Sequence, residues 1–209
     1  MHEAWEFLKH LVNPESIIHY GGLYLLLFVI FAETGLLVGF FLPGDSLLFT
    51  AGLFCATGIL NIHFYLLLLL IMIAAIAGNT AGYIFGWRVG VLLYKRKNSW
   101  LFKQTHLQMG KDFYEKNGGV AIVLSRFLPI FRTFAPIVAG IVRQDLRLFM
   151  LYNVLGAILW IGSLTTAGYV LGIIVPGIEE YLKYIILFLI AATSIPLIYK
   201  YLKSTDKRD

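Results

Sequence analysis

The sequence predicts an all-α polytopic membrane protein. In it, an inverted repeat of a re-entrant hairpin plus a transmembrane helix is followed by an extra C-terminal transmembrane helix. Three observations predict this fold class: the composition, the lengths of the apolar regions and an internal repeat. Of the 209 residues, 59% are hydrophobic and 14% are charged, and the mean hydropathy is +0.78. A soluble domain carries about 25% charged residues and could not bury so much apolar surface, so lipid is the expected solvent.

The apolar regions differ in whether they are interrupted. A spanning helix needs about 20 apolar residues, and three continuous regions are predicted to cross the bilayer, at 64–87, 149–175 and 184–201. Two other regions, 17–62 and 119–142, are broken by prolines and charges. Broken backbone is tolerated at membrane depth where protein or a water-filled cavity covers it. We therefore expect two re-entrant hairpins, whose tips contain Pro43, Gly44, Pro129 and Pro136.

The remaining segments of this single membrane domain set its predicted topology. Residues 1–16 form an amphipathic N-terminal segment, 88–117 a basic loop with an amphipathic helix, and 202–209 a basic tail. Basic segments face the cytoplasm. If 119–142 enters the membrane and returns, two crossings separate the loop from the tail, and both are cytoplasmic. A kinked full crossing of 119–142 is the alternative, and it would place them on opposite sides.

The chain repeats itself at one offset. Phe41-Leu42-Pro43 recurs as Phe127-Leu128-Pro129, and residues 80–86 (TAGYIFG) recur as residues 166–172 (TAGYVLG). The offset is 86 in both cases, since 129 − 43 and 166 − 80 are equal. Two matches in the same order indicate a duplication. Each unit is predicted to cross the membrane once, so the second unit inserts upside down, which is the plan of transporters with inverted repeats.

Four ionisable residues lie in apolar surroundings: Glu33, Asp45, Arg126 and Arg132. Each costs about 2.5–3.5 kcal/mol at the centre of a spanning helix, so partners or a function are expected. The two arginines flank Pro129, and a broken hairpin can turn both toward one centre, where they would suit a phosphate. The alternative is an ion-paired set of two arginines and two carboxylates. A phosphate could displace those carboxylates, so the two interpretations are compatible.

The two carboxylates have different alternatives. Asp45 or Ser46 could cap the second half-helix of the first hairpin. Glu33 lies well before the tip, among apolar residues. It is therefore either a fixed partner of an arginine or a carboxylate that takes up and releases a proton.

The other candidates are weaker. Close helix packing is the favoured role of the repeated small and aromatic residues Gly82, Tyr83, Gly168 and Tyr169. Interhelical hydrogen bonding or packing is favoured for Asn79, Asn153 and Trp160. There is one cysteine, and no metal-ligand spacing, nucleophile set or phosphate-cradling glycine loop. We expect no metal, no cofactor and no covalent catalysis. We also expect no nucleic-acid partner, because the basic residues that give the net charge of +5 flank apolar runs.

Together these residues resemble the DedA family, also described as the SNARE-associated or VTT domain family. The resemblance covers roughly Gly21 to Gly172. It rests on Glu33, Leu42-Pro43-Gly44-Asp45, Gly78 through Gly86, Ser125 through Arg132, Pro136, Ala139-Gly140, Asn153, Gly156 and Trp160. Many relatives carry glutamate in place of Asp45. The resemblance implies a lipid translocator of the bacterial cytoplasmic membrane, in which Glu33 and Asp45 are the required acids and Arg126 and Arg132 the required bases.

The expected function is therefore transport of a phosphate-headed lipid, coupled to protons. The resemblance implies undecaprenyl phosphate as the cargo, because bacterial members are implicated in returning it across the membrane, whereas eukaryotic relatives scramble phospholipids. The alternatives are an uncoupled phospholipid scramblase, a proton or ion antiporter, a lipid phosphatase and a purely structural membrane protein. The sequence leaves the exact lipid, the direction of transport and the oligomeric state open.

The predicted topology can be tested by labelling. Single cysteines at Lys97, Arg143 and Lys207, with Cys55 replaced first, should react with an impermeant reagent only from the cytoplasmic side. The reason is that all three positions lie in or beside basic segments, which the predicted re-entrant hairpin places on the cytoplasmic side of the membrane. External labelling at Arg143 would instead support the full crossing of 119–142.

Overall fold

The computed structural model describes residues 14–36, 42–95, 119–175, 177–181, 184–185 and 187–188. This part of the chain contains helices and turns and no strand, which confirms the all-α class. The helices, in chain order, are α2 (Pro14–Gly35), α3 (Gly44–Ala56), α4 (Phe64–Lys95), α6 (Val120–Ser125), α7 (Pro129–Ile141), α8 (Leu146–Ile174) and the short 3₁₀ helix η2 (Ile178–Tyr181).

Two helices are long and apolar enough to cross a membrane, over Phe64–Val89 and Leu146–Ile174. The first begins where the sequence predicts it, but α4 continues eight residues beyond 87, to Lys95. The second begins at Leu146 because Asp145 caps α8, its carboxylate accepting from the Leu148 amide at 2.9 Å. The other apolar helices, Gly21–Gly35, Gly44–Ala56 and Phe131–Ile141, are shorter. They fall below the length of about 20 residues that a span requires.

Several predicted segments lie outside the described residues. They are the N-terminal segment up to residue 13, residues 96–118 with the amphipathic helix of the basic loop, nearly all of the predicted span 184–201, and the tail 202–209. The first broken region, 17–62, contains α2 from residue 17 onward and α3, and the second, 119–142, contains α6 and α7. Residues 37–41, between α2 and α3, are also outside the described part.

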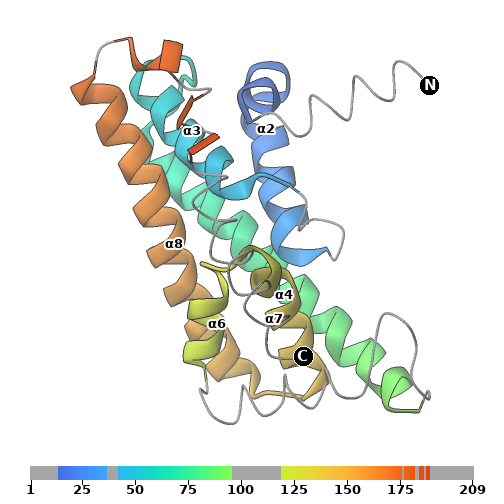
Figure 1. Ribbon diagram of the computed structural model, residues 1–209. Helices are drawn as coiled ribbons and strands as arrows, with labels where there is room; N and C mark the ends of the chain where they lie inside the picture. The colour runs from blue at the N-terminus through green and yellow to red at the C-terminus, as the bar shows by residue number, and fades with distance from the viewer. Residues whose placement is uncertain are drawn as a thin grey trace, which may run out of the picture.

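The second helix of each predicted hairpin packs against the long helix of the other predicted repeat unit. Thus α3 lies along α8, and α7 lies along α4. In Figure 1, α2 and α3 occupy the upper part of the molecule, α6 and α7 the lower part, and the two long helices run obliquely past both. This crossed packing brings the hairpins together from opposite ends of the long helices.

Glycines allow the backbones in these two helix pairs to approach closely. A Cβ atom at Gly168 of α8 would lie closer than 3.0 Å to the Phe49 carbonyl oxygen of α3. In the other pair, a Cβ atom at Gly140 of α7 would come equally close to the Tyr83 carbonyl oxygen of α4. Small residues at helix interfaces are typical of membrane bundles, where packing supplies much of the association energy.

Pro136 does not lie at a hairpin tip, and this part of the prediction is wrong. The tip is the turn of Arg126–Leu128, after which Pro129 begins α7 and Pro136 lies inside it. Pro129 suits the first position of a helix because no backbone N–H is needed there. Pro136 is tolerated within α7, and its ring packs beside Gly82, which has no side chain to obstruct it.

Two glycines of α8 provide a matched test of the packing. We expect Gly168→Ala to destabilise the protein by about 1–3 kcal/mol, because the methyl group would press on the α3 backbone. Gly162→Ala, in the same helix, meets no atom within 4 Å and should be neutral or stabilise by up to about 1 kcal/mol. Thermal unfolding in detergent measures both, and equal midpoints would contradict the close packing.

Candidate functional site

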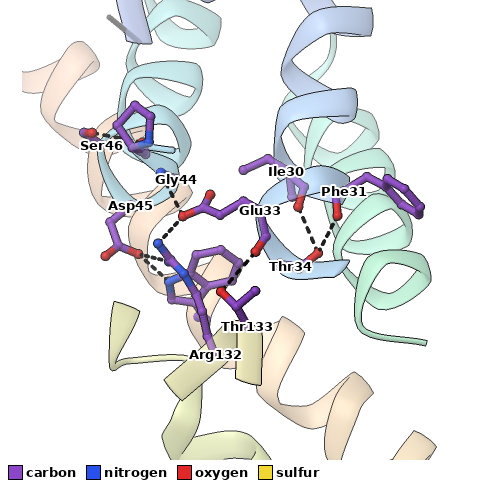
Figure 2. A network of polar contacts seen from close by, with 11 residues as sticks. Ile30, Phe31, Glu33, Thr34, Gly44, Asp45, Ser46, Arg132 and Thr133 are labelled. Atoms are coloured by element: carbon purple, nitrogen blue, oxygen red, sulfur yellow. Dashed lines mark hydrogen bonds and ion pairs between the residues drawn. The ribbon is translucent and has the colours of Figure 1, made fainter. Parts of the chain in front are cut away.

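The structure brings three of the four predicted charges into one buried ion-pair network. Arg132 of α7 donates through Nη2 to Glu33 Oε1 of α2, and through Nη1 to Asp45 Oδ1 of α3 at 2.8 Å. Figure 2 shows the guanidinium reaching between the two carboxylates. Glu33 and Arg132 are 0% and 3% exposed, whereas the Asp45 side chain is 16% exposed. We call Glu33, Asp45 and Arg132 the triad.

The cap of α3 comes from Glu33, whereas Asp45 or Ser46 was the expected capping residue. Glu33 Oε1 accepts from the Gly44 amide at 3.1 Å, while neither Asp45 nor Ser46 caps the helix. Asp45 points to Arg132 instead, and Ser46 donates to the Pro43 carbonyl oxygen at 3.0 Å. Gly44 is needed here because a Cβ atom would collide with the Glu33 carboxylate. The glycine of the Pro43-Gly44-Asp45 tip therefore makes room for a carboxylate from another helix.

Trp160 of α8 links the two arginines and Asp45. Its indole N–H donates to Asp45 Oδ1 at 2.8 Å. The Cζ atoms of Arg132 and Arg126 lie 5.1 Å and 5.9 Å from the centre of its ring, within the range of cation–π attraction. The side chain, predicted as packing, is 1% exposed and forms part of the charged site.

Arg126 has no carboxylate partner among the described residues, so the predicted pairing of two arginines with two acids is not what forms. Its Nη2 donates to the side-chain and main-chain oxygens of Asn153, at 2.5 Å and 3.2 Å. With the Asn79 amide turned so that both its ends are satisfied, Asn79 Oδ1 also accepts from Nη2, at 2.9 Å, and Nδ2 donates to Thr34 O. Arg126 is 1% exposed, and its Nη1 and Nε find no hydrogen-bond partner in the part of the chain that the structure describes.

The partners supplied by α8 follow helical spacing. Asn153, Gly156 and Trp160 are separated by three and four residues, which places them on one face of the helix. The function of Gly156 was not predicted: a Cβ atom there would lie 2.8 Å from Arg126 Cδ and 2.9 Å from Nε, so glycine is required for this side chain to lie against α8. The spacing of these three residues can be read from the sequence. It indicates that they share one helix face, but it does not indicate which residues that face contacts.

The remaining predicted residues lie away from the charges and stabilise the helix packing. The Tyr83 hydroxyl donates to the Gln144 carbonyl oxygen at 2.6 Å, and Tyr169 stacks on Phe64 with ring centres 4.2 Å apart. Gly82 faces the Pro136 ring and Gly168 faces α3. These four residues have the packing contacts that the sequence favoured.

The positive charge of the site is unevenly compensated. Arg132 has two carboxylate partners, while Arg126 has amide and carbonyl partners and two nitrogens without hydrogen bonds. A buried charge is normally paired, because isolated burial is costly. The described residues also close over the cluster, so a ligand must displace protein contacts to enter it.

The different environments of the two arginines predict different effects on stability. Arg132→Gln leaves two buried carboxylates without a counter-charge, and we expect a loss of about 3–5 kcal/mol. Arg126→Gln removes a charge that has no acidic partner, so its cost should be smaller, on the order of the 1 kcal/mol of a lost hydrogen bond. Thermal unfolding of both variants in one detergent tests this order, and a greater loss for Arg126→Gln would contradict it.

Comparison with known proteins places the chain in a family. Residues 42–170 match the VTT domain. The chain is 45% identical over 186 residues to "Protein DedA" of Escherichia coli K12, covering 87% of this chain and 84% of that protein. It is 40% identical to "Uncharacterized membrane protein ML0287" of Mycobacterium leprae, covering 88% and 82%, and 37% identical to "Inner membrane protein YqjA" of Escherichia coli K12, covering 78% and 72%. No solved structure matches the chain. The chain belongs to the VTT domain, or DedA, family of membrane proteins.

Proposed function

We propose that this protein moves a phosphate-headed lipid across the bacterial cytoplasmic membrane by transport that is coupled to protons, with undecaprenyl phosphate as the cargo. It acts as a transporter and forms no covalent bond with the lipid. The observation that carries the proposal is the buried guanidinium of Arg126, which lies beside the Arg132 triad without an acid of its own. A phosphate offers the oxygens that a guanidinium binds in a planar, bidentate way.

The proton would be carried by the triad. Glu33 uses Oε1 for both Arg132 and the Gly44 amide, while the buried Oε2 accepts no hydrogen bond. Oε2 is therefore the oxygen on which a proton would displace no existing contact. When an incoming phosphate draws Arg132 away, Glu33 loses its counter-charge, and uptake of a proton neutralises it. Release of the phosphate restores the ion pair and expels the proton.

The proposed route uses the two hairpins as re-entrant elements of an inverted repeat. Support comes from the short apolar helices and from the crossed packing of α3 on α8 and α7 on α4. Each residue of the triad comes from a different helix, α2, α3 or α7, so a shift of one hairpin relative to the other must rearrange the ion pairs. The lipid tail would stay in the bilayer while the head group passes the cluster.

Glu33→Gln tests the coupling, because the amide mimics the protonated carboxylate. We expect this variant to bind and move lipid but to lose its response to an imposed pH gradient. The measurement is translocation of labelled undecaprenyl phosphate in proteoliposomes with and without the gradient. Cys55→Ser is the control, since Cys55 lies on α3 and its thiol donates to the Ile62 carbonyl oxygen away from the triad.

The same assay separates the alternatives. Gradient dependence that persists in Glu33→Gln would refute the coupling role of this carboxylate. Equal movement of phosphatidylglycerol and undecaprenyl phosphate without any gradient effect in the wild type would identify an uncoupled scramblase. Gradient-driven ion flux without lipid would identify an antiporter, and release of inorganic phosphate from the lipid would identify a phosphatase.

A further inference from the structure

We infer that the two buried arginines have different functions, and that Arg126 alone is the resting anion receptor while Arg132 is held by the two carboxylates. This inference rests on the proposed function and deepens it, because it assigns the lipid phosphate to one place in the cluster. The ligand chemistry is an oxyanion that accepts hydrogen bonds from a guanidinium, as the phosphate of a lipid does.

The contacts of Arg132 show why it is not free to receive an anion at rest. Its two Nη atoms donate to Glu33 and Asp45, and Trp160 holds Asp45 in place through the indole N–H. With both acids ionised, the triad carries one net negative charge. An anion that approached it would be repelled until one carboxylate was protonated.

The contacts of Arg126 are of the opposite kind. All its hydrogen bonds go to uncharged amide and carbonyl oxygens, and they use only Nη2. Among the described residues, Nε and Nη1 are buried donors without a hydrogen-bond partner, and Nε lies close to Gly156. A fully buried cation with an unused donor is costly unless an anion completes its shell. The side chain therefore has the electrostatic properties of a receptor, and Asn79 and Asn153 orient it without neutralising it.

Trp160 lies next to both arginines and so provides a physical link between their two functions. Both guanidiniums lie within cation–π range of its ring, with Cζ atoms 5.9 Å and 5.1 Å from the ring centre for Arg126 and Arg132. Charge then sets the order of events: the anion binds first on Arg126, and Arg132 leaves the triad as Glu33 takes up a proton. Binding at rest should depend on Arg126 and be independent of the triad.

Two variants test whether Arg126 and the triad have different functions. Arg126→Gln removes the receptor and leaves the triad. The triple variant Glu33→Gln/Asp45→Asn/Arg132→Gln removes every charge of the triad, keeps the side-chain shapes of its two acids and leaves Arg126. The probes are undecaprenyl phosphate, phosphatidylglycerol and inorganic phosphate, and binding is followed by the emission of Trp160 in a protein whose other three tryptophans are replaced by phenylalanine.

We expect Arg126→Gln to weaken binding of undecaprenyl phosphate by about tenfold to a hundredfold, the effect of losing a hydrogen bond to a charged group. The triple variant should bind at least as tightly as the protein with an intact triad, because one net negative charge has been removed. Equal losses in the two variants, or unchanged binding in Arg126→Gln, would overturn the inference. Preference for the monoester lipid, the diester lipid or free phosphate identifies the source of the oxyanion.

A third variant covers the case in which the triple variant does not fold. Asn153→Asp keeps the shape of Asn153 and places a carboxylate on Arg126 Nη2, so the receptor gains an internal anion. We expect it to remain folded by circular dichroism and to lose binding as Arg126→Gln does. Wild-type affinity in folded Asn153→Asp would contradict the inference. Failure of the protein with intact Arg126 and triad to bind any probe would instead refute the proposed function itself.

Discussion

The ion pairs of Arg132 with Glu33 and Asp45 are the interaction on which the arrangement of the hairpins depends. They connect α7 to both α2 and α3, which lie in the other predicted repeat unit. Removing one partner would leave an uncompensated charge in a buried place, and this is one of the most destabilising changes a protein can undergo. The ion pairs therefore hold α7 against α2 and α3, and breaking them would be unfavourable.

Glycines allow the side chains and helices around these ion pairs to approach one another closely. Gly44 leaves room for the Glu33 carboxylate, and Gly156 leaves room for Arg126. Gly140 and Gly168 bring the second helix of each hairpin onto the opposite long helix. Because the long helices are thus fixed against α3 and α7, Asn153 of α8 reaches Arg126 in the turn after α6, and Trp160 of α8 reaches Asp45 of α3. The aromatic and amide groups of the site are positioned by packing that lies well away from it.

The uneven compensation of the two arginines is the feature with the greatest functional consequence. A set of charges paired two against two would be an inert structural core. Here one guanidinium has two acids and the other has none among the described residues, so the local field differs across a single indole ring. The proposed order of anion binding and proton uptake rests on this asymmetry.

The sequence by itself determined the helical membrane fold, the four buried charges and the break of each hairpin at Leu42-Pro43 and Leu128-Pro129, because apolar length, charge cost and proline chemistry are local properties. It also favoured packing for Gly82, Tyr83, Gly168 and Tyr169, but it did not indicate the close contacts of Gly140 and Gly156. Only the tertiary structure decided that Glu33, and not Asp45, caps α3, that Pro136 lies within α7, and that both acids face Arg132 while Arg126 faces Asn153. Partner choice among four charges depends on which helices cross and where, and that geometry is set by contacts between residues as far apart as Glu33 and Arg132, which no local pattern contains.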